Sequence, residues 1–112
     1  MRRLTVQTLP AAATLTALLT FAPPEGQPHG AVTMLSITNT SSYADRVRVS
    51  LALQGQADTL AQYLYYDMLL PGNDTFIVEL ATGLPLYAGD VVRGYSETGA
   101  SAFQVHAREE AS

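Results

Sequence analysis

Apolar and polar residues alternate along most of the chain with the period of two that is typical of β-strands. The segment 46–53 shows the pattern most clearly. One face of it carries Val47, Val49, Leu51 and Leu53, and the other carries Arg46, Arg48, Ser50 and Ala52. This pattern predicts a sheet with one buried and one solvated face. Similar alternation predicts strands over 14–21, 31–38, 63–70, 75–80, 91–95 and 102–107, with a weaker one over 3–9.

Turn residues separate these segments. Pro and Gly punctuate 22–30, which predicts a loop, and Pro71-Gly72-Asn73-Asp74 is a strong turn signal. The segment 59–62 lacks strand bias and predicts a short helical turn. We therefore predict an all-β chain, folded as a single antiparallel β-sandwich of about 7–8 short strands. Jelly-roll and immunoglobulin-like topologies both fit this pattern.

A length of 112 residues fits one domain with one core. We expect an N-terminal arm or edge strand over 1–12, the β-sandwich domain over 13–108 and a polar tail over 109–112. An arm of this kind could add a strand to the sheet edge of a neighbouring molecule. Within 14–21, the alternation predicts one face made of Leu15, Ala17, Leu19 and Phe21.

The charge pattern argues against nucleic-acid binding. Charged residues make up only 14% of the chain, the net charge is −4, and all six cations are Arg. A nucleic-acid interface needs a dense basic footprint, which this chain lacks. Arg46 and Arg48 share a strand face and form the one internal basic patch. This patch is either a solvated face or an interface with an acidic partner.

The N-terminal segment has some features of a secretion signal, because Arg2 and Arg3 precede an apolar stretch over 9–22. However, several Thr residues and Pro10 interrupt this stretch. It is also too short and too polar to span a bilayer. We therefore expect neither a cleaved signal peptide nor membrane insertion.

Candidate chemistry is sparse. The chain has no Cys, and His29 lies in the predicted loop while His106 lies in the last predicted strand, without metal-ligand spacing. Most Asp residues fall at turns, where Asp caps backbone N–H groups, and Glu109 lies in the predicted solvated tail. No phosphate-cradling glycine loop is present. We predict no catalytic residue, no metal site and no cofactor, and hence no enzyme.

One strand is unusually rich in tyrosine. The alternation places Tyr63 and Tyr65 on one face and Tyr66 on the other. Tyrosine is common at interfaces because it buries area while keeping a polar tip, although one face could simply cover the core. The residues we select as a candidate interface are Tyr63, Tyr65, Tyr66, Arg46, Arg48, Leu4 and Val6.

Four segments together resemble a known group of proteins. They are Ile37-Thr38-Asn39-Thr40-Ser41, Val47-Arg48-Val49-Ser50-Leu51, Leu70-Pro71-Gly72-Asn73-Asp74-Thr75 and Leu86-Tyr87-Ala88-Gly89-Asp90-Val91-Val92-Arg93. Over about 14–110 the chain resembles the small β-sandwich virion proteins of tailed bacteriophages, which are tail, fibre-associated or capsid-surface components. The stretch 105–109 departs from the Ser-Gly-x-Glu-like ending common in such proteins.

The resemblance implies a non-enzymatic structural protein of the virion. Such a protein assembles as a symmetric oligomer, and its partners are copies of itself and other virion proteins. The resemblance transfers no catalytic residue. The alternative is a carbohydrate-binding or host-adhesion module, in which Tyr63, Tyr65 and Tyr66 would stack on a glycan.

Overall fold

The computed structural model describes residues 2–22 and 29–110, and these residues form eight strands and two single-turn 3-10 helices. No α-helix occurs among them, so the all-β prediction is confirmed. The elements in chain order are β1 (Arg2–Thr8), β2 (Thr16–Thr20), β3 (His29–Asn39), β4 (Asp45–Ala52), η1 (Leu53–Gly55), η2 (Leu60–Gln62), β5 (Tyr63–Leu70), β6 (Thr75–Tyr87), β7 (Val91–Ser96) and β8 (Ser101–Glu110).

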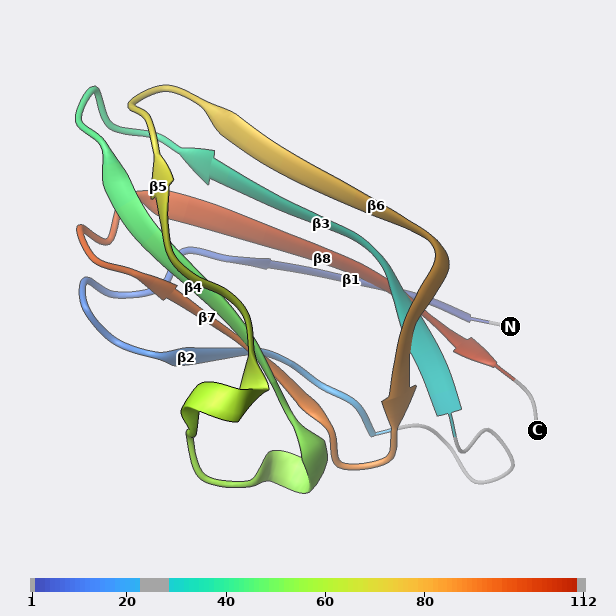
Figure 1. The fold of residues 1–112 in the computed structure, drawn as a ribbon. Helices are drawn as coiled ribbons and strands as arrows, with labels where there is room; N and C mark the ends of the chain where they lie inside the picture. The colour runs from blue at the N-terminus through green and yellow to red at the C-terminus, as the bar shows by residue number, and fades with distance from the viewer. Residues whose placement is uncertain (1, 23–28, 111–112) are drawn as a thin grey trace.

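The strands form two packed antiparallel sheets, as predicted (Figure 1). The first sheet has the order β1-β8-β3-β6 and the second has the order β2-β7-β4-β5. This pairing of early with late strands is the arrangement of an eight-stranded jelly roll. Of the two topologies that fit the sequence, the structure therefore has the jelly roll.

The core lies between the sheets and is built from the inward residues of both. Its largest fully buried apolar side chains are Phe21, Phe103, Ile37 and Leu86. Val47 and Val49 on β4 are buried as the alternation predicts. In contrast, Leu53 is 54% exposed, because β4 ends at Ala52 and the chain turns into η1.

The predicted face of β2 is wrong at Ala17, which is exposed, whereas Leu18 and Leu19 are both buried. The cause is an irregularity in the pairing of β2 with β7 between Ala17 and Leu19. A bulge inserts one extra residue into a strand and therefore shifts the alternation by one position.

Two predicted boundaries within the first sheet also need correction. The predicted loop over 22–30 is too long, because His29 and Gly30 already belong to β3, while residues 23–28 lie outside the described residues. β6 continues well past the predicted end at residue 80 and passes through Gly83, whose φ is +82°. Gly tolerates this left-handed backbone without a steric penalty.

The predicted polar tail over 109–112 begins too early. β8 runs to Glu110, and Glu109 is only 1% exposed rather than solvated. The reason is that Glu109 continues the inward-facing positions of β8, after the buried Phe103, Val105 and Ala107. In the strand register it lies between Arg2 of β1 and Gly30 of β3. β1 itself is an edge strand, and in this structure it pairs with β8 of its own chain.

Candidate functional site

The two long sides of the sandwich differ. On one side, β1 of the first sheet and β2 of the second approach each other. On the other side, β5 and β6 leave their shared hairpin at Pro71–Asp74 and then separate, as Figure 1 shows at the upper left. The sandwich is therefore open between β5 and β6.

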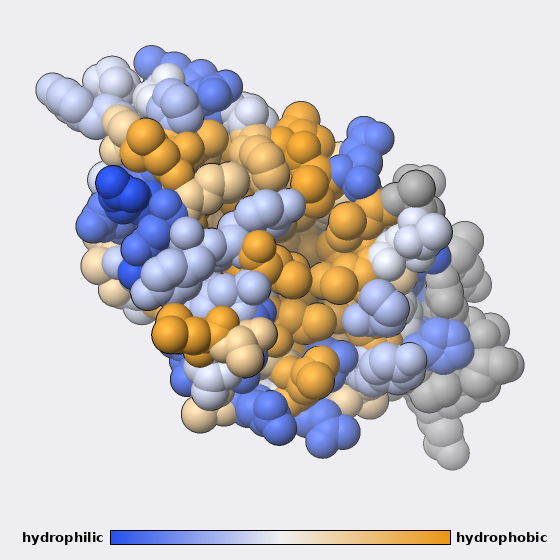
Figure 2. Space-filling view, in the orientation of Figure 1, coloured by the Kyte–Doolittle hydropathy of each residue, from blue (hydrophilic) through white to orange (hydrophobic). Residues whose placement is uncertain are grey.

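The opening contains an apolar cleft with a volume of about 220 Å³. Figure 2 shows it as a hollow lined with hydrophobic side chains on the face of the molecule between β5 and β6. Residues from both sheets line it, and all of them except one tyrosine are aliphatic: Val32, Leu35, Val49, Leu64, Tyr65, Val78, Leu80, Leu84, Val92 and Val105. Among the described residues, none of those lining the cleft is charged.

Tyr65 closes the cleft toward the hairpin. Its ring meets Phe76 edge to face, with a centroid distance of 5.2 Å and an interplanar angle of 77°. Such edge-to-face pairs contribute about 0.5–1.5 kcal/mol beyond the area they bury. This contact links the two sheets at the hairpin, and the sheets diverge beyond it.

A second cluster lies on the outer face of the β2-β7-β4-β5 sheet. The Arg48 guanidinium carbon lies 4.4 Å from the ring centroids of both Tyr66 and Tyr95. Its Nε also donates a hydrogen bond of 2.5 Å to Oδ1 of Asp67. This hydrogen bond is the main reason why the pKa of Arg48 is raised above its ordinary value. The cation is thus held in place by two rings and a carboxylate.

Tyr63 joins this outer cluster. Its ring meets that of Tyr66 edge to face at a centroid distance of 5.0 Å. Burial, together with the hydrogen bond from its hydroxyl to Asp58, raises the pKa of Tyr63. We refer below to Arg48, Tyr63, Tyr66, Asp67 and Tyr95 as the outer cluster.

The structure separates the residues selected from the sequence. Tyr63 and Tyr65 do not share a face, because the register of β5 with β4 shifts between Val49, which lies opposite Tyr65, and Ser50, which lies opposite Tyr63. Tyr66 pairs with Tyr63 instead of opposing it. Arg46 is exposed, and no described contact joins it to the outer cluster.

Leu4 and Val6 lie on the first sheet at its β1 edge, away from the tyrosines of β5. Both are partly buried and pack against the core. The cleft itself was missed at the sequence level. Its lining residues read as ordinary inward positions of strands, and nothing in the alternation indicates which side of a sandwich stays open.

Buried polar side chains serve the fold. Asp45 is 1% exposed, and its Oδ2 accepts hydrogen bonds from the hydroxyls of Ser96 and Ser101, each at 2.5 Å. Its Oδ1 accepts one from the Thr98 amide. Burial by itself would raise the pKa of Asp45, but these hydrogen bonds outweigh it and lower the pKa below its ordinary value. Such a carboxylate stays ionised and joins three strands or turns rather than moving protons.

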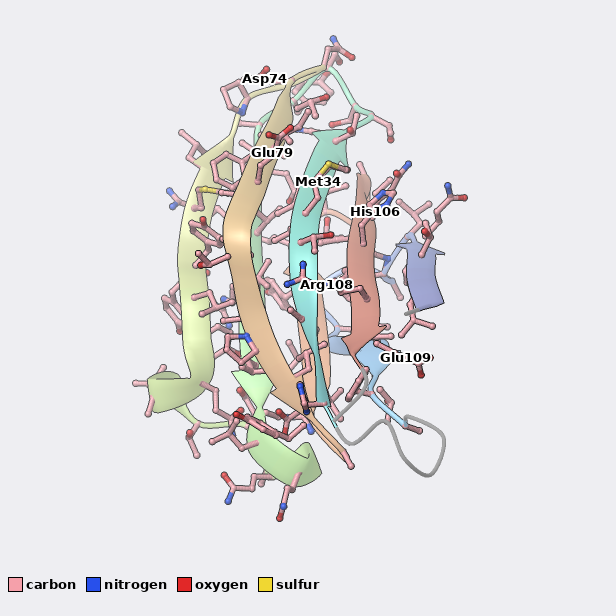
Figure 3. All side chains as sticks on the ribbon, turned by 90° about the vertical axis from the view of Figure 1, so that its right-hand side faces the viewer. Met34, Asp74, Glu79, His106, Arg108 and Glu109 are labelled. Atoms are coloured by element: carbon pink, nitrogen blue, oxygen red, sulfur yellow. The ribbon has the colours of Figure 1, made fainter. Side chains whose placement is uncertain are left out.

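The described residues place neither histidine in a group of potential metal ligands. His106 lies on the outer face of the first sheet, where Figure 3 also places Met34 and Glu79, and its Nε2 lies 3.4 Å from Oε1 of Gln104. Within the described residues, no group of three or more His, Asp or Glu side chains is arranged to hold a metal ion. No helix in residues 2–22 and 29–110 is long and apolar enough to cross a membrane.

Comparisons with known proteins give two solved structures of interest. No protein-family model and no curated protein matches the sequence. Both structures are described as a pentameric capsid protein isolated from metagenomic phage sequences. One is 16% identical with a TM-score of 0.40, covering 97% of this chain and 61% of its own. The other is 15% identical with a TM-score of 0.39, covering 96% and 64%. The chain thus spans less than two thirds of the length of either protein.

Proposed function

We propose that this protein is a non-enzymatic structural component of a bacteriophage virion, which assembles with copies of itself into a symmetric oligomer on the tail or capsid. The observation that carries the proposal is the apolar cleft between β5 and β6. A sandwich with one closed and one open side has a surface that is completed by contact with another molecule.

The physical reason is the hydrophobic effect. Each square ångström of apolar surface removed from water stabilises an assembly by about 25 cal/mol. Here the accessible apolar surface includes Leu64, which is 46% exposed at the rim of the cleft. Contact with a second molecule at this rim would remove that apolar surface from water.

Two further features support a role in the virion. The low share of charged residues, 14%, leaves a largely neutral surface that suits close contact between copies. The jelly roll is an architecture of viral capsid domains, although lectins and cupins share it. The virion assignment therefore rests on the resemblance of the four sequence segments together with this fold.

The carbohydrate-binding alternative has weaker support. A sugar stacks on the open face of an aromatic ring, but Tyr65 points into the core region against Phe76. The Arg48 guanidinium occupies a face of Tyr66. The platform of three tyrosines expected from the sequence is therefore not formed.

Two measurements test the proposal. Native mass spectrometry of the purified chain should give one discrete oligomer, and peptide mass spectrometry should find the chain in purified phage particles at a fixed copy number. A chain that stays monomeric at every concentration and is missing from the particles would overturn the proposal.

A further inference from the structure

The structure also indicates how neighbouring copies meet. We propose that β1 of one copy adds to the free edge of β6 in the next copy, so that the first sheet continues from molecule to molecule and β1 covers the mouth of the cleft. This inference rests on the proposed self-association and specifies its geometry.

The strand directions allow this addition. β1 and β6 are the two edges of the same sheet, on opposite sides of it in Figure 3, and all neighbouring strands in that sheet are antiparallel. Because the sheet has four strands, β1 and β6 run in opposite directions. A second sheet placed beside the first in the same orientation therefore continues the antiparallel ladder.

The four edge strands of the sandwich are not equally able to accept a partner. β2 and β5 both contain register shifts, which twist an edge and interrupt its ladder. β1 pairs with β8 over seven consecutive residues without any shift. β6 pairs regularly with β3 from Thr75 to Glu79, before its own irregularity. The two regular edges are thus β1 and the first half of β6.

One register brings these two edges together with matching faces. It places Thr5 of one copy opposite Ile77 of the next, and both side chains are exposed on the outer face. The same register gives four further cross-strand pairs: Leu4 with Val78, Val6 with Phe76, Arg3 with Glu79 and Gln7 with Thr75.

The first two of these pairs lie on the inward face. Val78 lines the cleft, and Leu4 is partly buried beside the core of its own copy. Directly opposed residues in an antiparallel pair have Cβ atoms about 4.5–5.5 Å apart. Leu4 of the arriving copy therefore falls beside the mouth of the cleft and extends its apolar wall.

The strand position of Arg3 opposite Glu79 distinguishes this register from its neighbours. Shifting β1 by two residues in either direction keeps the inward and outward faces matched, but it places a different residue opposite Glu79. Opposite charges in directly opposed positions of an antiparallel pair stabilise that pairing, and like charges destabilise it. Glu79 is exposed on β6, where such a partner can reach it.

This contact is heterologous, because it joins two different surfaces. Heterologous contacts generate a closed ring when the rotation between copies closes, and an open filament when it does not. A symmetric oligomer built this way is a ring, in which every copy both gives a β1 edge and receives one.

Disulfide trapping tests the geometry directly, since the chain has no native cysteine. The variant carrying Thr5→Cys and Ile77→Cys should form oligomers linked by disulfides under mild oxidation. Within one chain these positions are three inter-strand spacings apart, or roughly 14 Å, and no disulfide spans that distance. Every disulfide formed therefore joins two copies.

The matched control carries Thr5→Cys and Ser36→Cys. Ser36 is the partner of Ile77 one strand further inside the sheet, so it lies beyond the reach of an arriving β1. We expect disulfide-linked ladders for the first variant on denaturing gels and none for the control. Equal cross-linking in both, or an intact oligomer by native mass spectrometry with no Thr5–Ile77 link, would overturn the proposed geometry while leaving self-association in place. A monomer would instead overturn the proposed function.

A charge exchange tests the register independently. Arg3→Glu and Glu79→Arg should each weaken assembly about threefold or more, and combining them should restore it, which no purely structural role of either residue predicts. Glu97→Arg serves as the control, because Glu97 is exposed in the turn after β7. The register is wrong if the double variant assembles no better than the single ones.

Discussion

The turns at one end of the sandwich and the open side between β5 and β6 differ in what they bury. At what we call the turn end, the turns over 40–44, 71–74 and 97–100 meet and bury polar side chains (Figure 1). Along the open side, β5 and β6 separate and leave apolar side chains accessible in the cleft. Buried polar groups and exposed apolar groups are the informative departures from ordinary burial, and these two regions show one kind each.

At the turn end, the polar groups satisfy one another. Asn39 is fully buried, and its amide donates to the carbonyls of Tyr43, Leu70 and Pro71. Its Oδ1 accepts hydrogen bonds from the amide and hydroxyl of Ser41. The polar groups of Asn39 thus have partners within the chain, and we assign this end to stability. The open side has the reverse property, since its apolar surface gains from a partner, and we assign it to assembly.

The largest expected effect is on stability at the turn end. Asp45→Ala removes the acceptor for Ser96, Ser101 and Thr98 and should lower the free energy of unfolding by about 3 kcal/mol. Urea denaturation measures this change. Asp74→Ala is the control, because Asp74 is exposed and should cost less than about 1 kcal/mol. Similar losses in both variants would contradict the special role of the buried Asp45 carboxylate within the turn end.

Acid should reveal the same carboxylate. The pKa of Asp45 is lowered on folding from its ordinary value of 3.8, so its ionised form stabilises the fold above that pH. This stabilisation should disappear as the pH falls below about 3.8 through the lowered value. The urea midpoint of the wild type should therefore fall more steeply in this range than that of Asp45→Ala. Parallel curves would rule out a lowered pKa.

On the open side, the expected effect is on assembly rather than folding. Leu64→Ser at the rim of the cleft should weaken the oligomer about tenfold, or roughly 1.4 kcal/mol, and change stability by less than about 1 kcal/mol. Leu69→Ser is a matched control on the same strand, since Leu69 is 58% exposed and does not line the cleft. Analytical ultracentrifugation gives both dissociation constants. If both variants weaken assembly equally, the rim of the cleft has no special part in assembly.

The smallest expected effect concerns the outer cluster. Arg48→Ala removes the contacts with Tyr66, Tyr95 and Asp67 and should destabilise the fold by about 1 kcal/mol, because these contacts are partly exposed to solvent. Arg46→Ala, on the same face of the same strand but exposed, should change stability by less than about 0.5 kcal/mol. If Arg46→Ala lowers the free energy of unfolding more than Arg48→Ala does, the contacts of the outer cluster do not stabilise the fold as proposed.

The sequence predicts the elements better than their irregularities. β5 spans 63–70 and η2 forms a short turn at 60–62 as expected, because Tyr, Leu and the following Pro71 and Gly72 are strong local signals. The bulge that buries both Leu18 and Leu19 has no such signal. The same holds for the shift in the β4–β5 register between Val49 and Ser50, which places Tyr65 and Tyr63 on opposite faces.

The open side depends on long-range arrangement. Val78 and Leu84 read as inward residues, and whether such residues are covered depends on how the facing sheet lies over them. Glu109 shows the converse case, since a charged residue near the end of β8 lies at an inward-facing position and is buried. Local periodicity records neither relation, and so the cleft and the buried Glu109 both required the folded structure.

Hydrogen exchange of the β6 edge tests the central claim most directly. Amide exchange over 75–79 is compared between a dilute sample, in which the oligomer dissociates, and a concentrated one. Our account predicts that assembly slows exchange in this segment and at the β1 edge, while the turn end around Asn39 is equally protected in both samples. Unchanged exchange over 75–79 in a sample shown to be oligomeric would contradict the claim that the open side is where copies meet.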